Sequence, residues 1–391
     1  MNAPSSQPRP ERSARSRAGQ LARRLTLAAL CALVAGEIGA RVLLGSKFVQ
    51  GAHTGPPQAL GGQLDPDLGW TLRPNQDFQV AGAGFRYSIR TNSRGFRDSE
   101  RSFAKPAGLK RVAVLGDSTA FGWGVDQDKM WSAQLQGLLG QGVEVLNFAV
   151  PGYSTDQELW LLEHEVVRYD VDLVLLGVVL NDVLGNDNPL IHDMRKAHWV
   201  KDEQGQWMLT DHPVPGARAT LWTKLRHARR SLARYVALAK LPDRRMPRHV
   251  RTPLDEPGTS ERLRRVFDGM ADSNTATGML LERFGAACQR QDAPLVAFVI
   301  PHQHDRYLYD IAAKRTETEP FDGTGEFTTY ATRVLQRAGA AAGFQVVSID
   351  AALLEETKRA TNLDCGDEHL NARGNQVVAL ALEAVVQKSL E

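Results

Sequence analysis

The sequence predicts an α/β fold in which helices cover both faces of a parallel β-sheet. Short, strongly apolar segments recur from residue 111 to the C-terminus, and segments with helical periodicity separate them. Strands that alternate with helices in this way form βαβ units, whose strands are parallel. The composition agrees with a folded domain, because 42% of the 391 residues are hydrophobic and 24% are charged.

The alternating region contains five candidate strands. They are expected at residues 111–115, 143–148, 172–180, 295–300 and 344–349. Helices are expected between and after them, at 129–139, 157–167, 261–291, 327–342 and 372–388. Sheets of this kind bind ligands beyond the carboxyl ends of their strands, so polar residues that directly follow a strand are the first candidates for function.

Two segments precede this alternating region. Residues 51–75 are rich in Gly and Pro and indicate a linker or an irregular crossing, whereas 77–91 predicts a hairpin with a Gly-rich turn at 81–84. The predicted organisation is therefore a linker and hairpin region at 45–108, followed by one domain at 109–391.

The alternation lapses between residues 185 and 255, where we expect a helical insertion. This stretch contains Trp199, Trp207 and Trp222, and a basic run at 224–251 has arginines at helical spacing. A helix on an anionic membrane surface or on an acidic polymer is one interpretation. The solvated face of a lid helix is the other, and we favour it because charged runs usually face solvent.

The N-terminus predicts export and anchoring. Residues 1–24 carry six arginines and one acid, Glu11, and their composition predicts disorder in a basic cytoplasmic tail. An apolar segment follows at 25–44, interrupted by Glu37 and Arg41. The arginines before it orient a signal anchor with the rest of the chain outside the cytoplasm, in the periplasm. A cleaved signal peptide and a buried helix remain the alternatives.

Charge and cysteine content exclude some functions. A net charge of +2 gives no argument for binding nucleic acid. The three cysteines, Cys31, Cys288 and Cys365, form neither a CxxC motif nor a Cys/His cluster, so no metal site is predicted. Cys288 and Cys365 are not expected to pair, because they belong to opposite ends of the sheet, about 17–20 Å apart.

Reactive side chains gather where the predicted strands end. The first strand runs into Gly116-Asp117-Ser118, the second into Pro151-Gly152 and the third into Asn181-Asp182, and Asp367-Glu368-His369 precedes the last helix. Ser and Asn are also common helix caps, so each residue taken alone has a structural explanation. Three of these blocks follow consecutive strands and the fourth precedes a helix. Coincidence in all four places is less plausible than one shared site.

These residue types suit nucleophilic catalysis. A serine hydroxyl needs a base to become a nucleophile, and His369 is the candidate because an imidazole can accept and return a proton near neutral pH. A carboxylate behind the histidine, for which Asp367 is the candidate, would orient the imidazole. The backbone N–H groups of Ser118 and Gly152 and the side-chain amide of Asn181 would stabilise the oxyanion.

The four blocks together resemble the SGNH, or GDSL-type, hydrolase family. The matching residues are Gly116-Asp117-Ser118, Gly152, the run from Gly177 to Asn181-Asp182, and Asp367-x-His369, over about residues 110–390. The resemblance implies a three-layer, flavodoxin-like parallel sheet, a serine nucleophile and a reaction without metal or cofactor. In the last block the family's usual spacing is Asp-x-x-His, whereas Asp367-x-His369 is similar to alginate O-acetyltransferase-type proteins. Asp364 is therefore the alternative acid.

Other polar residues fall near the same edge of the sheet. Asp117 and Asp182, together with His302 and His304 after the fourth strand, are candidates for the substrate pocket. Two histidines beside an acid can bind a metal, but we do not expect one here because the resembling family needs none.

Three functions remain open from the sequence. We expect ester hydrolysis by an exported enzyme acting on acylated carbohydrate or lipid. An O-acyltransferase that modifies an envelope or exported polysaccharide is the first alternative, since only the acceptor differs. A non-catalytic, glycan-binding envelope protein is the second. The expected partners are an ester or acylated-glycan substrate and the membrane, but no nucleic acid.

Overall fold

A computed structural model describes residues 62–81, 85–191, 194–214, 259–300, 328–359, 363, 365 and 369–391, with some α-helical positions between 23 and 35. The chain divides into two units. The first, Met1–Ala52 with Ala219–Pro247, contains only those helical positions among its described residues. The second, His53–Arg218 with Arg248–Glu391, contains the fold.

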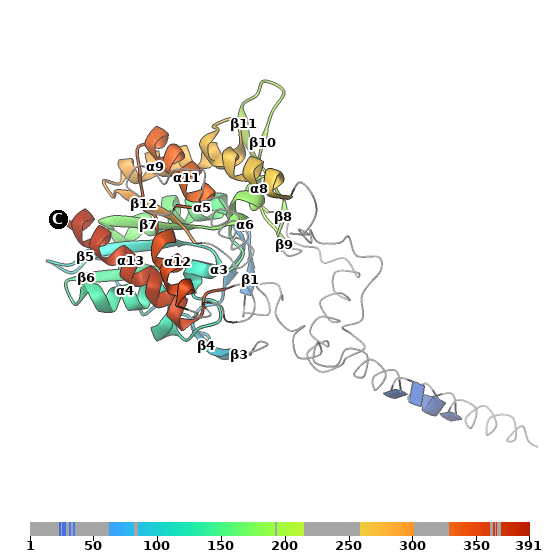
Figure 1. The fold of residues 1–391 in the computed structure, drawn as a ribbon. Coiled ribbons are helices and arrows are strands. Elements are labelled where there is room, and N and C mark those ends of the chain that lie inside the picture. Colours follow the sequence, from blue (N-terminus) through green and yellow to red (C-terminus); the bar gives the residue numbers. More distant parts are fainter. Residues whose placement is uncertain are drawn as a thin grey trace, which may run out of the picture. The chain divides into compact units, whose positions relative to one another are not determined.

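A five-stranded parallel sheet forms the centre of the second unit (Figure 1). Its strands lie in the order β13-β12-β7-β5-β6, and every neighbouring pair is parallel. Their bounds are β5 (Lys110–Gly116), β6 (Val143–Asn147), β7 (Leu173–Val178), β12 (Leu295–Val299) and β13 (Gln345–Val346). These are the five predicted strands, and the predicted α/β class is confirmed. Strand β6 lies on one side of β5 and the next strand, β7, lies on the other. This reversal of direction places a topological switch point at the carboxyl end of β5.

Helices cover both faces of the sheet (Figure 1). α4 and α13 pack against each other, whereas α9 packs against both α5 and α11. The bounds are α3 (Ser118–Phe121), α4 (Trp131–Leu139), α5 (Thr155–His164), α6 (Leu180–Gly185), α8 (Thr259–Asp268), α9 (Ala276–Arg290), α11 (Tyr330–Ala342), α12 (Asp350–Lys358) and α13 (Ala372–Leu390). Short 3₁₀ turns are η2 (Gln127–Lys129), η3 (Val166–Tyr169) and η5 (Gly269–Ala271).

The single helix predicted at 261–291 is two helices. After α8 the chain makes the turn η5, and Thr275 then caps α9 by accepting a hydrogen bond from the Gly278 N–H at 3.1 Å. Asp272 and Asn274 belong to this break and bond to nearby backbone and side-chain groups, which is the usual way in which these residues compete with a helix.

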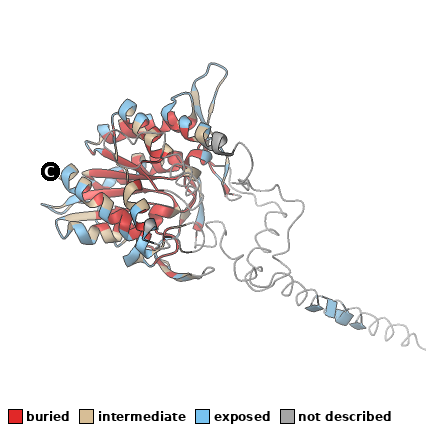
Figure 2. Ribbon diagram, in the orientation of Figure 1, coloured by how far each residue is buried: buried red, intermediate tan, exposed pale blue. Residues whose placement is uncertain are grey.

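The core lies between the sheet and the inner faces of the helices (Figure 2). All six residues of β7 are buried, as expected for a central parallel strand with helices on both sides. At the edge strand β6, Gln136 accepts a hydrogen bond from the Val145 N–H at 2.8 Å and donates to the Val143 carbonyl at 2.7 Å. These bonds satisfy backbone groups that would otherwise be open to another strand.

Two hairpins precede the sheet in the chain. β3 (Asp77–Ala81) and β4 (Arg86–Arg90) form the predicted one. β1 (Gly62–Asp65) and β2 (Gly69–Leu72) form a second hairpin inside the segment predicted as a linker, which corrects that prediction. The composition suggested an irregular segment because Gly and Pro dominate it, but Trp70 and Leu72 of β2 are buried in the core.

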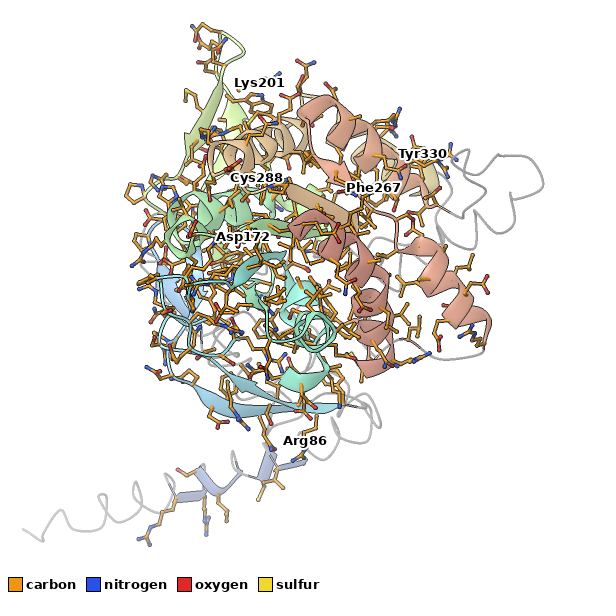
Figure 3. All side chains as sticks on the ribbon, turned by 90° about the vertical axis from the view of Figure 1, so that its left-hand side faces the viewer. Arg86, Asp172, Lys201, Phe267, Cys288 and Tyr330 are labelled. Atoms are coloured by element: carbon orange, nitrogen blue, oxygen red, sulfur yellow. The ribbon has the colours of Figure 1, made fainter. Side chains whose placement is uncertain are left out.

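The first part of the insertion consists of strands and is not helical. β8 (Leu190–Ile191) pairs with β9 (Met194–Arg195), and β10 (His198–Lys201) pairs with β11 (Trp207–Thr210). Figure 3 shows Lys201 of the β10–β11 hairpin and Arg86 of the β3–β4 hairpin at opposite ends of the domain. Trp222 and the basic run at 224–251 lie outside the described residues.

No helix in the described part of the chain is both long and apolar enough to cross a bilayer. The anchor expected at 25–44 falls largely outside the described residues and stays a prediction. Among the residues that the structure describes, Cys288 and Cys365 are not joined to each other by a disulfide.

Candidate active site

The nucleophile candidate lies in the turn that joins β5 to α3. Asp117 is the N-cap of α3, and its Oδ1 accepts hydrogen bonds from the Thr119 N–H at 2.8 Å and the Thr119 hydroxyl at 2.9 Å. Ser118 is therefore the first helical residue, and its hydroxyl is not needed for the cap. Ser118 is half-buried between fully buried neighbours, so its Oγ can reach both the interior and a substrate.

Gly116 makes the turn possible. Its φ of +148° lies in a region that favours glycine. A Cβ at this position would lie 2.7 Å from the Ala120 Cβ and 3.0 Å from the Gly177 carbonyl oxygen. Any larger residue would push α3 away from the ends of β5 and β7.

Ser118 and His369 meet at this turn, although 251 positions separate them in the sequence. His369 Nε2 lies 2.8 Å from Ser118 Oγ. His369 lies three residues before the start of α13, whose N-cap residue, Asn371, accepts hydrogen bonds from the backbone of the first turn of the helix. The imidazole also stacks on Trp123, with ring centroids 5.4 Å apart and planes 30° apart. The histidine is thus held from both sides in a position to take the serine proton.

Two backbone N–H groups at the site are available to a ligand. The loop after β6 is held next to the nucleophile turn by a hydrogen bond from the Val150 N–H to the Gly116 carbonyl at 3.2 Å, and Gly152 in this loop has a φ of +80°. Within the described ranges, neither the Ser118 N–H nor the Gly152 N–H has a hydrogen-bond acceptor.

Asn181 brings a side-chain donor to the same place. It is the second residue of α6, which starts directly after β7. Its Nδ2 donates to Asp117 Oδ2 at 3.0 Å, whereas its 3.4 Å contact to Asp182 Oδ1 is longer than an ordinary hydrogen bond. One amide hydrogen is therefore well held and the other can serve an oxyanion.

A family model matches the part of the chain that contains these residues. The model of the GDSL-like Lipase/Acylhydrolase family matches residues 114–377, which is more than half of the chain. The chain belongs to the GDSL-like lipase/acylhydrolase family. No curated protein matches it by sequence.

Solved structures also resemble the chain. A lipolytic G-D-S-L protein from Veillonella parvula is 12% identical, with a TM-score of 0.37 over 72% of this chain and 100% of that one. The psychrotrophic esterase EstA from Pseudoalteromonas is 11% identical, with a TM-score of 0.36 over 72% and 98%. A carbohydrate acetylesterase from Sinorhizobium meliloti is 11% identical, with a TM-score of 0.34 over 71% and 99%. Likeness at this level carries no information about the substrate.

Two of the residues predicted to line the substrate pocket are buried. Asp117 and Asp182 are 1% and 0% exposed, so their assignment to the substrate pocket is corrected. Both are internal acceptors: Asp117 binds Ser118, Thr119 and Asn181, and Asp182 Oδ2 accepts the Val179 N–H at 2.7 Å at the start of α6. Sequence spacing placed them at the edge of the sheet but could not show which way they point.

The acid behind His369 and the other pocket candidates lie outside the described residues. Asp367 and its alternative Asp364 fall there, as do His302 and His304. Their roles stay predictions.

A cluster of buried acidic side chains surrounds Glu158, behind the turn that carries Ser118. Burial raises the pKa of Glu158 on α5 well above its usual range, and the charges of Asp117 and Asp156 raise it further. Burial likewise raises the pKa of Asp182, with Glu158 as the next cause. Asp156 is ion-paired with the buried Lys196, whereas neither Glu158 oxygen has a hydrogen-bond partner in the described structure. Burial without a hydrogen bond therefore favours the protonated form of Glu158.

Two residues that position the site escaped prediction. Trp123 forms the wall against His369, and Arg97 fixes the turn that presents Trp123. The Arg97 guanidinium donates to the carbonyls of Phe121, Gly122 and Val125 at 3.2, 2.6 and 2.7 Å. Burial lowers its pKa to about 10. An arginine between strands gives no sequence signal of this role, because its acceptors are backbone groups of a distant turn.

Proposed function

We propose that the protein hydrolyses carboxylic esters through an acyl-enzyme formed on Ser118. The observation that carries this proposal is the 2.8 Å distance between Ser118 Oγ and His369 Nε2. A serine that only started a helix would use its hydroxyl for the cap, but Asp117 performs that task here. The family membership supports acylhydrolase chemistry, and the three oxyanion donor candidates are the N–H of Ser118 itself, the N–H of Gly152 in the loop after β6 and the side-chain amide of Asn181 on α6.

The first half of the reaction acylates the enzyme. Ser118 Oγ attacks the ester carbonyl carbon while His369 Nε2 takes the hydroxyl proton, and the carbonyl π electrons move to the oxygen. The N–H groups of Ser118 and Gly152 and the Asn181 amide stabilise the resulting oxyanion, each contributing about 3–4 kcal/mol in comparable sites. The tetrahedral intermediate collapses, the C–O bond to the alcohol breaks, and His369 protonates the departing alkoxide.

The second half regenerates the enzyme. A water molecule attacks the acyl carbon of the Ser118 ester, and His369 takes one of its protons. Collapse of the second intermediate breaks the bond to Ser118 Oγ, which regains its proton from His369. The products are a carboxylic acid and an alcohol.

We place the substrate among acylated carbohydrates or lipids. Support comes from the family, whose name covers lipases and acylhydrolases, and from the predicted export, which would bring the domain to envelope polymers and lipids. The acyl chain length is the property that distinguishes the two substrate classes.

Labelling with a fluorophosphonate tests the proposal directly. The full chain should incorporate one phosphonyl group, and peptide mapping should place it on Ser118. Ser118→Ala should lose the label and at least about 10³-fold in turnover of p-nitrophenyl esters. Ser102→Ala, at an exposed serine, is the matched control and should keep both. A panel of C2 to C16 acyl chains then separates deacetylase from lipase activity.

The outcomes distinguish the alternatives. Hydrolysis of acyl esters with labelled Ser118 supports the proposed function. Labelled Ser118 with acetyl transfer to a glycan and little release of acetate would make the protein an O-acyltransferase instead. Folded protein that neither reacts with the fluorophosphonate nor turns over any ester would contradict an enzymatic function.

A further inference from the structure

The β1–β2 hairpin precedes the region that the family model matches, yet it contacts the loop after β6 that contains Gly152, here called the oxyanion loop. The family match begins at residue 114, whereas the hairpin spans 62–72. Trp70 of β2 is fully buried, and its indole Nε1–H donates to the carbonyl of Pro151 at 3.2 Å. Pro151 is the residue before Gly152, so the hairpin touches the peptide unit that carries an oxyanion donor.

The contact is reciprocal and well packed. The Tyr153 hydroxyl donates to the Trp70 carbonyl at 2.6 Å, and the two rings meet edge to face with centroids 5.5 Å apart. Gln157 on α5 donates from Nε2 to the Leu68 carbonyl at 2.7 Å. Trp70 and Tyr153 have no exposed surface. The residues before and after Gly152, Pro151 and Tyr153, are therefore both hydrogen-bonded to Trp70.

The geometry of one peptide group links this contact to catalysis. The Pro151–Gly152 peptide bond is trans, because His212–Pro213 is the one cis bond among the described residues. In a planar trans peptide the C=O and the N–H point in opposite directions. A donor that holds the Pro151 carbonyl toward the hairpin thereby directs the Gly152 N–H away from it. Hydrogen bonding to the carbonyl also strengthens the N–H as a donor.

We propose that Trp70 is a positioning residue that orients the oxyanion donor of Gly152 through the Pro151 carbonyl. The inference rests on the proposed function of Ser118. Gly152 has a φ of +80°, and glycine populates many conformations, so this peptide would rotate easily without an external contact. Val150 anchors the loop to Gly116 on the nucleophile side, and its carbonyl accepts the Tyr153 N–H at 3.2 Å, so residues 150–153 form a turn. Neither bond involves the central Pro151–Gly152 peptide, which could still flip within the turn. Trp70 removes this freedom.

The hairpin itself is firmly placed. Gly69 has a φ of +84°, and a Cβ there would lie 2.2 Å from the Arg195 carbonyl oxygen, so β2 and β9 approach at backbone distance. The Pro66 carbonyl accepts a hydrogen bond from the Val214 N–H at 2.6 Å. A rigid hairpin can hold a peptide orientation, whereas a loose one could not.

Trp70→Phe tests the proposal, because it keeps a buried aromatic ring and removes the N–H donor. In the full chain it should lower kcat on p-nitrophenyl acetate about tenfold or more, with KM within about twofold. It should weaken inhibition by phenylboronic acid by a similar factor. The boronic acid forms a tetrahedral anion when Ser118 Oγ adds to boron, and so it needs the same oxyanion donors. A purely structural role for Trp70 would not couple these two readouts.

Trp207→Phe is the matched control. It also removes an indole donor to a backbone carbonyl, that of Ser273 at 3.4 Å, but on the β10–β11 hairpin. It should leave kcat and boronic acid inhibition unchanged. Tyr153→Phe, which removes the hydroxyl bond to the Trp70 carbonyl, should lower kcat about two- to tenfold. If Trp70→Phe does not fold, Tyr153→Phe decides the matter, and an unchanged kcat overturns the proposal.

The other overturning result is a folded Trp70→Phe enzyme with wild-type kcat and wild-type boronic acid inhibition. The failure of this inference is distinguishable from the failure of the proposed function. In the first case wild-type turnover and its loss in Ser118→Ala both stand. In the second case the wild-type chain has no turnover that depends on Ser118.

Discussion

Asp117→Asn is the substitution whose effect the structure defines most closely. The Asp117 carboxylate is 1% exposed and accepts three hydrogen bonds from Thr119 and Asn181. Oδ1 takes the Thr119 N–H and the Thr119 hydroxyl at 2.8 and 2.9 Å. Oδ2 takes the Asn181 amide at 3.0 Å and also lies 3.0 Å from Ser118 Oγ, whose one hydrogen goes to His369 in the proposed mechanism. The substitution keeps the size of the side chain but turns one of its two acceptors into a donor.

The new amide group should face Asn181. The Thr119 N–H is a backbone group and cannot turn away, so the one oxygen that the substituted side chain retains stays on it and preserves the cap of α3. The new NH₂ then meets the Asn181 NH₂ across the former 3.0 Å hydrogen bond. Two donors repel, and a buried donor without an acceptor costs about 1–3 kcal/mol. The Asn181 side chain should swing away, which removes one oxyanion donor and lowers kcat about 10²- to 10³-fold.

Steady-state kinetics and urea unfolding measure both effects. We expect Asp117→Asn to lose about 1–3 kcal/mol of unfolding free energy together with the kcat loss. Thr119→Val is the control. It removes one bond to the same carboxylate but spares Asn181, so it should destabilise by about 1 kcal/mol and leave kcat nearly intact. An Asp117→Asn enzyme with kcat within about threefold of wild type would refute the idea that this carboxylate holds Asn181.

Two further predictions concern the turn and the buried acid. Gly116→Ala places a Cβ 2.7 Å from the Ala120 Cβ. It should lower the free energy of unfolding, measured in urea, by about 1–3 kcal/mol, and it should also reduce activity. Gly137→Ala in α4, where nothing lies within 4 Å, should stabilise by about 0.5–1 kcal/mol, and equal effects at the two glycines would contradict the packing argument. Burial raises the pKa of Glu158 above its ordinary 4.5, so the folded protein binds a proton that the unfolded chain releases, and wild-type stability falls as pH rises above that value. Glu158→Gln removes this loss, and its stability relative to wild type should grow by up to about 1.4 kcal/mol per pH unit from near pH 4.5 upward; parallel stability curves would exclude a protonated Glu158.

Short-range patterns predicted the sheet well. β7 is an uninterrupted apolar run, and only a strand buried on both faces needs such a run. The break between α8 and α9 also has a local cause, because the Asp, Ser, Asn and Thr residues at 272–275 favour turns and caps. The predicted helix at 261–291 ignored that signal.

The β1–β2 hairpin was missed for a different reason. Few features within 62–72 favour a strand over a loop, since the segment is short and contains Gly62, Pro66 and Gly69. What stabilises it is the burial of Trp70 against Tyr153, a residue 83 positions further along the chain. No local pattern contains that information.

The sequence by itself determined which residue types follow which strands, and with them the family and the candidates Ser118, Gly152, Asn181 and His369. It could do so because strand and helix periods, and the turns between them, depend on neighbours a few residues apart. The tertiary structure alone decided that Asp117 caps the helix while Ser118 turns to His369, that Asp182 points inward, and that Trp70 holds the oxyanion loop. These outcomes depend on tertiary packing, which brings together groups that are 64 to 251 residues apart in the chain. They also depend on which of these groups lose contact with water.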